Sequence, residues 1–404
     1  MTQTAPERVR VALVFGGVSS EHDVSCLTAG GVTRAIDTDR FEVVGIGITP
    51  SGRWVQVPTD EMAVMEVVDN RLPRLHDDRP EAVVMRNGGA GCGRVATLDG
   101  ERLTDGRDFD VVFPLLHGPF GEDGTVQGLF EMLGIRYVGC GVAASANAMD
   151  KDLMRRQLKS AGLPLYPWVT ISKADWDADA QRWLDRCSVD LEFPVYVKPA
   201  RGGSSMGISR VPEPAGLRAA IEEAQRFDPK VLVEQGFVGI REIELAVLGV
   251  TGGAPAASVA GEIQVHTEDA FYDYEAKYTP DEQVDLVIPA EVSPKLLRRM
   301  QRVAAATFTA MGCEGLARVD LFVTPDDEVW VNELNTMPGF TRLSMYPSLW
   351  QATGLPYADL IAELLKAQPL TTTHAAEKAV RLGLERARPN MSKADIKMSV
   401  RRTF

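Results

Sequence analysis

The chain has 404 residues, of which 45% are hydrophobic and 25% charged, and its formal net charge is −13 at pH 7. The length predicts two or three domains, and the acidic balance argues against a nucleic-acid scaffold. No apolar stretch approaches the roughly 18 residues that a membrane span needs. The five scattered cysteines form no C-x-x-C pair, which indicates a reduced cytosol.

The first third of the chain alternates short apolar runs with helical patterns. We expect strands at Val9–Phe15, Phe41–Ile48 and Val111–Leu116, and helices at about Val24–Ile36 and Thr125–Leu133. This order predicts an α/β domain with a mostly parallel sheet and helices on both faces. Residues 55–108 interrupt the alternation and are expected to form an insertion with a few edge strands.

From about residue 140 the order of elements changes. One helix is expected at Met149–Ala161 and a long one at Pro294–Met311. Strands are expected at Pro194–Pro199, Gly207–Val211, Val231–Gln235, Glu242–Leu248, Asp285–Ile288, Ala317–Val323 and Glu328–Leu334. The turn residues Pro325-Asp326-Asp327 join the last two strands as a hairpin. We therefore expect antiparallel α+β structure after the first domain.

The end of the chain differs in charge from the rest. Residues 371–404 hold 8 Lys or Arg and 3 Asp or Glu, a net charge of 8 − 3 = +5. A helix near His374–Arg386 and then a loosely ordered, solvated tail are expected, in preference to a site for an anionic partner.

A loop rich in glycine and serine runs from Lys198 to Gly207. Its backbone N–H groups and its two basic residues have the composition of a phosphate-binding loop. Residues 203–207 also match the nucleophile elbow G-x-S-x-G, but an elbow leads into a helix, and a strand is expected here. Residues 139–144 match a dinucleotide fingerprint without the acidic residue expected about 20 residues later, so a turn is favoured.

Polar residues alternate with apolar ones on the two last strands. Arg318 and Asp320 share one face of their strand, and Glu333 and Asn335 share one face of the next. If the strands pair as a hairpin, two carboxylates, an amide and a guanidinium converge. Such oxygen ligands suit Mg²⁺, and a surface salt-bridge patch is the alternative.

Three further segments carry candidate residues. Phe271–Tyr278 holds three tyrosines and Lys277, and it is either a lid whose lysine contacts a phosphate or an aromatic edge strand. Gly16–His22 and His117–Gly124 both follow strands of the first domain, where open α/β sheets place ligands. Glu21 is a candidate for holding an ammonium group. For His22 and His117 the alternative is hydrogen bonding within a turn.

Eight motifs in order resemble the D-alanine–D-alanine ligase family, which are ATP-grasp enzymes of bacterial cell-wall synthesis. They are residues 16–25, 117–124, 149–151, 198–199, 203–207, 271–278, 318–320 and 332–339, and the resemblance spans about residues 8–367. It implies an N-terminal α/β domain with the first substrate site (1–139) and a two-part α+β ATP-grasp module with antiparallel sheets (140–233 and 234–367). The basic tail (368–404) lies outside the resemblance.

The resemblance also implies the reaction, which is ATP-dependent ligation of two D-alanines through a D-alanyl phosphate. A cytoplasmic homodimer with two Mg²⁺ or Mn²⁺ ions follows from it, with no nucleic-acid or membrane partner. The implied phosphate-binding residues are Lys151, Lys198, Ser205 and Lys277, the adenine and ribose residues are Glu234 and Glu242, and the metal ligands are Asp320, Glu333 and Asn335.

Seven residues are expected to handle the amino acids. The resemblance implies that Glu21 holds the first ammonium and Ser344 the second carboxylate, and that Arg318 and the Gly339 N–H form an oxyanion hole. It also implies a latch in which Tyr278 bonds to Ser204 and Ser204 to Glu21, and His117 is a further expected catalytic residue. In the family this tyrosine marks dipeptide formation. The alternatives are a depsipeptide ligase using D-lactate, a silent nucleotide-binding protein and a nicotinamide oxidoreductase.

Overall fold

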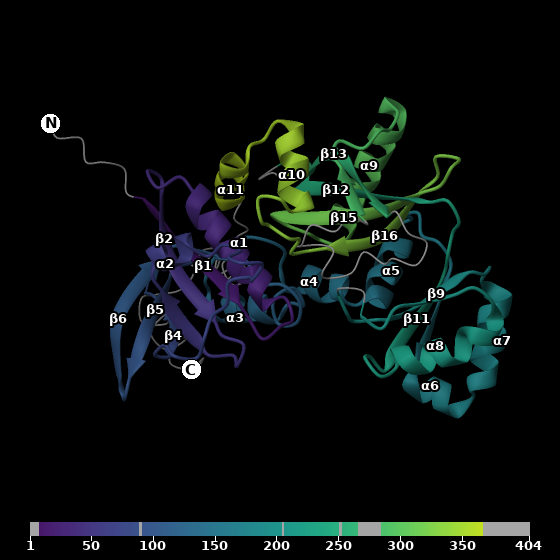
Figure 1. Ribbon diagram of the computed structural model, residues 1–404, viewed down its shortest axis with the longest axis horizontal. Coiled ribbons are helices and arrows are strands. Elements are labelled where there is room, and N and C mark those ends of the chain that lie inside the picture. The colour runs from purple at the N-terminus through teal and green to yellow at the C-terminus, as the bar shows by residue number, and fades with distance from the viewer. Residues whose placement is uncertain (1–7, 89–90, 204–205, 250–252, 266–283, 367–404) are drawn as a thin grey trace, which may run out of the picture.

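The computed structural model describes residues 8–88, 91–203, 206–249, 253–265 and 284–366, which form an elongated molecule with an N-terminal domain at one end (Figure 1). The candidate lid Phe271–Tyr278 and the basic tail lie outside these residues. In the described part of the chain, no helix has the length and apolar composition to cross a membrane.

The N-terminal domain is built on a four-stranded sheet in the order β3-β2-β1-β7. Its strands are β1 (Val9–Gly16), β2 (Phe41–Ile48), β3 (Trp54–Val57) and β7 (Val111–Pro114). Strand β1 runs parallel to β2 and β7, and only β3 is antiparallel to its neighbour. The prediction of a mostly parallel sheet is confirmed.

Helices cover both faces of this sheet, as predicted. Helices α1 (His22–Ala35) and α11 (Tyr357–Lys366) pack against one face, and α3 (Thr125–Leu133) packs against the other. Residues 11–15 of β1 are fully buried. A strand covered on both sides reads as a continuous apolar run, which is why it was visible in the sequence.

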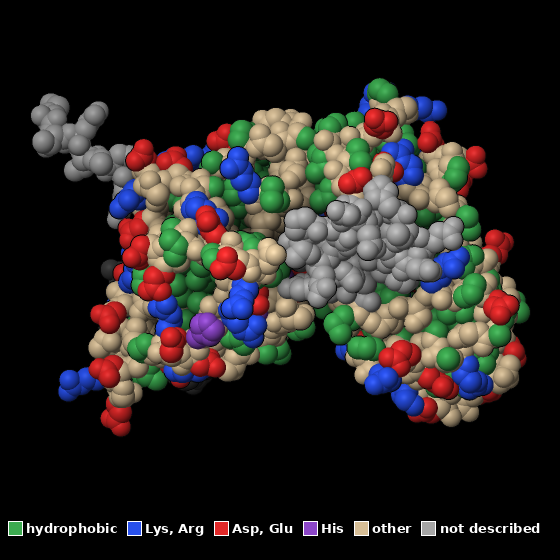
Figure 2. All heavy atoms as spheres, viewed as in Figure 1, with side chains coloured by type: hydrophobic (Ala, Val, Ile, Leu, Met, Phe, Trp, Pro, Cys, Tyr) green, Lys and Arg blue, Asp and Glu red, His purple; other side chains and the backbone are tan. Residues whose placement is uncertain are grey.

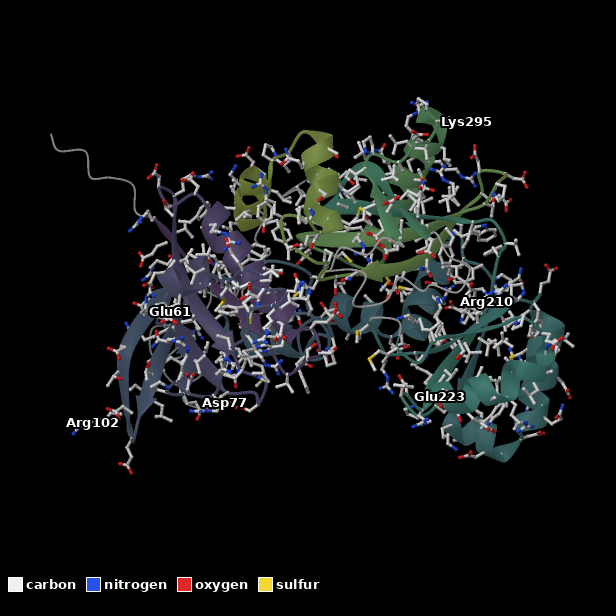
Figure 3. All side chains as sticks on the ribbon, viewed as in Figure 1. Glu61, Asp77, Arg102, Arg210, Glu223 and Lys295 are labelled. Atoms are coloured by element: carbon white, nitrogen blue, oxygen red, sulfur yellow. The ribbon has the colours of Figure 1, made fainter. Side chains whose placement is uncertain are left out.

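The insertion after β3 contains the short helix α2 (Thr59–Ala63) and three strands. Strands β4 (Ala82–Arg86), β5 (Gly93–Asp99) and β6 (Arg102–Phe109) form an antiparallel sheet of their own. Arg102 lies at the far end of this sheet, away from the other regions of the molecule (Figure 3).

The expected helix at Met149–Ala161 is confirmed as α5 (Lys151–Ser160). A further helix, α4 (Val142–Met149), was not expected, and Asp150 separates it from α5 in an extended conformation. The Asp150 carboxylate accepts hydrogen bonds from the N–H groups of Asp152 and Leu153 and so caps α5. The break places Lys151 at the first position of α5.

The second region is a four-stranded antiparallel sheet in the order β10-β9-β11-β8. Its strands are β8 (Trp168–Ser172), β9 (Val195–Pro199), β10 (Ser209–Val211) and β11 (Lys230–Gln235). It is covered by α6 (Lys173–Ala178), α7 (Ala180–Asp190) and α8 (Leu217–Ala224), the last preceded by a 3₁₀ turn at Pro214–Gly216. Because β9 and β10 form a hairpin, the loop between them is not a nucleophile elbow.

The third region is a five-stranded antiparallel sheet in the order β14-β13-β12-β15-β16. Its strands are β12 (Arg241–Leu248), β13 (Ala256–Val265), β14 (Val284–Val287), β15 (Leu316–Val323) and β16 (Val329–Asn335). Helices α9 (Pro294–Ala310) and α5 pack on one face, and α10 (Met345–Thr353) covers part of the other. On the face drawn in Figure 2, charges of both signs are interspersed over the outer regions.

Candidate functional site

The face of the five-stranded sheet opposite α9 carries a row of charged side chains. Val319 and Leu321 of β15 belong to the core under α9, so Arg318 and Asp320 point the other way. Asp320 lies directly opposite Glu244 of β12 on one side and Glu333 of β16 on the other. The predicted hairpin and the predicted convergence of charged residues are both confirmed.

A β-bulge aims Glu333 at this face. The pairing of β15 with β16 passes from Asp320–Glu333 to Leu321–Val331 and leaves Asn332 without an opposite residue. Val331 and Leu334 both lie in the core, which an unbroken alternation would not allow. The bulge therefore turns Glu333 and Asn335 toward the face that holds Asp320.

Arg318 is held by two carboxylates. Its Nε and Nη2 lie 2.7 Å from Asp320 Oδ1 and Oδ2, and its Nε lies 3.1 Å from Glu244 Oε2. Burial opposes the charge on Arg318, but Asp320 and Glu244 outweigh it and raise its pKa above the ordinary value. Glu244 was not singled out in the sequence, because it follows the ordinary alternation of a strand.

The residues at this face fit a magnesium ion. Two carboxylates and one amide oxygen, from Asp320, Glu333 and Asn335, come from adjacent strands and are the oxygen ligands that Mg²⁺ takes. Asn335 Oδ1 accepts a hydrogen bond from Met337 N at 2.9 Å, which fixes its amide. Among the described residues, no three His, Cys, Asp or Glu side chains form a preassembled metal cluster. A magnesium ion bound by Asp320 and Glu333 would therefore also need the Asn335 amide oxygen and oxygen atoms of the bound substrate.

Two lysines, one on α5 and one on β9, are candidates for binding phosphate. Lys151 Nζ donates to Gly202 O at 2.9 Å and lies 3.6 Å from Glu333 Oε2. Lys198, at the end of β9, pairs with Glu234 at 2.8 Å. The structure thus brings Lys151 and the start of the glycine-rich loop to the carboxylate row, and it pairs Lys198 with Glu234 of the neighbouring sheet. Four predicted site residues, Ser204, Ser205, Lys277 and Tyr278, lie outside the described residues.

Glu234, expected beside an adenine, is buried, and its carboxylate faces inward to Lys198. Aromatic rings lie next to it: Tyr166 is in contact with Phe237 and Phe322, and Phe237 stacks on Trp330. Planar rings of this kind suit a stacked base, and no motif in the sequence marks them. Glu242, expected at the ribose, lies exposed at the start of β12.

The two loops of the N-terminal domain meet beside the carboxylate row. His117 Nδ1 lies 3.2 Å from Met337 O, and its buried Nε2 finds no hydrogen-bond partner in the described chain. The structure therefore rejects a hydrogen bond within its own turn for His117. For His22 the turn interpretation is confirmed, because Nδ1 lies 2.9 Å from Gly17 O. Burial lowers the pKa of the His117 imidazole. The nearby Glu21 carboxylate would raise that pKa, but burial has the larger effect.

Glu21 and Ser344 occupy the ends of helices. Glu21 precedes α1, and a Cβ added to Gly118 would lie 3.1 Å from Glu21 Oε2. Ser344 precedes α10, and its Oγ accepts from Thr341 N at 3.1 Å. The N-terminus of α10 presents N–H groups that favour a carboxylate. Gly339 lies between Asn335 and this helix, in the loop that follows β16.

Glu122 is a further carboxyl group at the site, and no role was expected for it from the sequence. Its Oε1 accepts from Gly118 N at 3.1 Å. Burial, and then the neighbouring charge of Glu21, raise its pKa from 4.5 to about 8. Glu122 lies close to Glu21, the residue expected to hold an ammonium group. Because the pKa of Glu122 is about 8, its carboxyl group is largely protonated at pH 7.

Replacing Glu122 by glutamine is expected to make stability less dependent on pH. A carboxyl whose pKa is raised on folding stabilises the fold below pH 4.5 and loses that contribution as pH rises through about 8. As the pH rises from 6 to 9, the melting temperature of the wild type should therefore fall relative to that of Glu122→Gln. Thermal unfolding without ligands measures this, and a constant difference between the two proteins would contradict it.

Comparison with known proteins gives consistent matches along the chain. Residues 10–140 match the family described as D-ala D-ala ligase N-terminus, and residues 157–366 match D-ala D-ala ligase C-terminus. The D-alanine–D-alanine ligase of Kineococcus radiotolerans is 48% identical over 371 residues, covering 88% of this chain and 96% of that protein. That of Mycolicibacterium gilvum is 46% identical over 366 residues, covering 89% and 96%.

Solved structures agree with these matches. The D-alanine–D-alanine ligase from Coxiella burnetii superposes with a TM-score of 0.76 at 31% identity, covering 95% of this chain and 99% of that one. The VanG D-Ala:D-Ser ligase from Enterococcus faecalis superposes with a TM-score of 0.75 at 33% identity, covering 89% and 99%.

Proposed function

Because this chain belongs to the D-alanine–D-alanine ligase family, we propose that it uses ATP to join two D-alanines into D-alanyl-D-alanine for peptidoglycan synthesis. The observation that carries the proposal is the row Glu244–Asp320–Glu333, with Arg318 beside it and Lys151 facing it. Phosphoryl transfer depends mainly on positioning and on neutralising charge, and this row supplies both.

In the proposed first step, the carboxylate of one D-alanine attacks the γ-phosphorus of ATP and forms D-alanyl phosphate and ADP. Lys151 and Lys198 hold the phosphates, and the aromatic group of Phe237, Phe322 and Trp330 borders the adenine. Magnesium bound by Asp320, Glu333 and Asn335 would neutralise the charge of the phosphates. Glu21 orients the first D-alanine through its ammonium group.

In the proposed second step, the amine of another D-alanine attacks the carbonyl carbon of D-alanyl phosphate. The oxygen of the tetrahedral intermediate takes negative charge, and Arg318 and the Gly339 N–H stabilise it. The attacking nitrogen loses a proton, the bond to phosphate breaks and the phosphate leaves with the electron pair, so the products are the dipeptide, inorganic phosphate and a proton. Ser344, at the N-terminus of α10, receives the carboxylate of the second D-alanine. Exclusion of water matters because water would hydrolyse the acyl phosphate.

The proposal extends to the setting and the domains of the enzyme. We place the first substrate site in residues 1–139 and the ATP-grasp module in residues 140–233 and 234–367. We propose that the enzyme works in the cytoplasm, where ATP is available. The family resemblance further suggests a homodimer.

Phosphate release from ATP is the measurement that tests this function. We expect release to require D-alanine and Mg²⁺, to be near background with L-alanine or with no amino acid, and to yield D-alanyl-D-alanine by mass. Parallel reactions with D-alanine plus D-lactate or D-serine show whether a hydroxyl nucleophile or another amino acid is accepted. Phosphate release that is independent of D-alanine would contradict the proposal.

A further inference from the structure

Beneath the proposed nucleotide site lies a cluster of charged residues, which we call the buried ion cluster: Arg155 of α5, Lys198 of β9 and Glu234 of β11. The side chains of Arg155 and Glu234 are 1% and 2% exposed, and that of Lys198 is 12% exposed. Buried charges are costly unless they are paired. The way in which this cluster balances its charges therefore determines what its members can bind.

Glu234 divides its two oxygens between two cations. Arg155 Nε lies 2.8 Å from Oε1, and Lys198 Nζ lies 2.8 Å from Oε2. The hydroxyl of Tyr166 lies 3.2 Å from Oε2, and burial raises its pKa to about 12, so it stays neutral at pH 7. Burial opposes the ionisation of Glu234, but the two cations outweigh it and hold its pKa at about 2. The cluster therefore holds two positive charges against one negative charge.

The two cations differ in what they can reach. The guanidinium of Arg155 lies over the Tyr166 ring at 4.1 Å and near the Trp168 ring at 5.6 Å, and it is enclosed. Lys198 lies at the end of β9, where the chain enters the glycine-rich loop. Its ammonium group sits on a flexible stem. The Lys198 ammonium group can therefore turn from Glu234 to a phosphate, whereas the enclosed Arg155 guanidinium keeps its contact with Glu234.

We propose that Arg155 is a positioning residue that neutralises Glu234 and thereby frees Lys198 to bind the phosphates of the nucleotide. This inference rests on the proposed function. When Lys198 turns to a phosphate, Glu234 keeps one cation and does not become an isolated buried charge. Without Arg155, Lys198 would be the one cation in direct contact with Glu234 among the described residues, and breaking a buried pair is costly. Nucleotide binding would then compete with that pair.

Binding of a non-hydrolysable ATP analogue to the full chain, measured by calorimetry with Mg²⁺, tests this role. Arg155→Met removes the charge and keeps much of the volume, and we expect the affinity to fall about 10- to 100-fold. Arg155→Lys should bind close to the wild-type level. The matched control is Arg156→Met on the same helix, because Arg156 is 64% exposed and pairs with Asp152. It should leave the affinity unchanged.

A double-mutant cycle separates charge balance from packing. In a Glu234→Gln background there is no buried carboxylate to neutralise, so adding Arg155→Met should change the affinity less than about twofold. If Arg155→Met alone does not fold, comparing Glu234→Gln with the double variant still tests the inference. An affinity equal to wild type in folded Arg155→Met, or an equal loss in both backgrounds, would overturn the inference. Failure of the proposed function is distinct, because the wild-type chain would then bind no adenine nucleotide.

Discussion

Asp320→Asn and Glu333→Gln are each expected to lower kcat about 10²–10³-fold, because a bound cation supplies several kcal/mol of charge stabilisation in phosphoryl transfer. Both substitutions keep the shape of the side chain and remove one negative charge. The two carboxylates lie opposite each other on β15 and β16 and face the same side of the sheet. Phosphate release measured over a range of Mg²⁺ concentrations gives the loss, and a raised Mg²⁺ requirement should accompany it.

Asp326→Asn is the matched control for these two variants. Asp326 lies exposed in the turn that joins β15 to β16, so the same change of charge is made on the same hairpin away from the site. It should leave both kcat and the Mg²⁺ requirement unchanged. Near-normal turnover of Asp320→Asn or Glu333→Gln at saturating Mg²⁺ would remove the metal assignment.

The elements that were predictable from the sequence are those whose burial leaves an unmistakable pattern. Strands β1 and β2 are covered on both sides, so their sequences are near-continuous apolar runs, and their bounds were nearly reproduced. Helix α9 begins at Ser293-Pro294, where the serine hydroxyl accepts from Leu296 N. A serine followed by proline is a strong start signal for a helix.

The elements that were missed depend on contacts between distant residues. Asp150 divides α4 from α5 because it pairs with Lys230 and bridges to Arg201, neither of which is near in sequence. Helix α4 was not expected, because residues 139–144 were interpreted as a turn between elements. The break matters for the site, since it sets the position of Lys151.

The candidate site shows the same division. Arg318, Asp320, Glu333 and Asn335 were visible because polar residues alternate with apolar ones on a strand. The role of Arg155 was not visible, because a basic residue in the polar helix sequence Lys-Asp-Leu-Met-Arg-Arg reads as solvent-exposed. Only the packing of α5 against β11 shows that Arg155 is enclosed and the adjacent Arg156 is not.

Arg318→Ala is expected to lower kcat about 10²–10³-fold, as removal of a single oxyanion-hole donor does. The structure predicts a second effect. Glu244 and Asp320 are buried, and Arg318 is paired with both, so its loss leaves carboxylates facing each other on adjacent strands. Breaking a buried ion pair by removing one partner costs about 3–5 kcal/mol of stability. Thermal unfolding should therefore show a lower melting temperature for Arg318→Ala.

Arg318→Lys separates the catalytic effect from the loss of stability. Lysine keeps the positive charge between Glu244 and Asp320, so most of the stability should return. It cannot reproduce the two parallel N–H···O bonds to Asp320 or present the same planar donor to an oxyanion. We therefore expect kcat to remain well below wild type in a stable Arg318→Lys protein, with a smaller change in KM for ATP.

Arg210→Ala is the control for loss of an arginine from the ATP-grasp region. Arg210 lies exposed on β10, away from the carboxylate row, and is labelled in Figure 3. Its removal should change neither kcat nor the melting temperature. Steady-state rates at saturating ATP and D-alanine, together with KM for each substrate, decide the role of Arg318. A change confined to KM for ATP would show that Arg318 binds the ground-state phosphates and does not stabilise the tetrahedral intermediate.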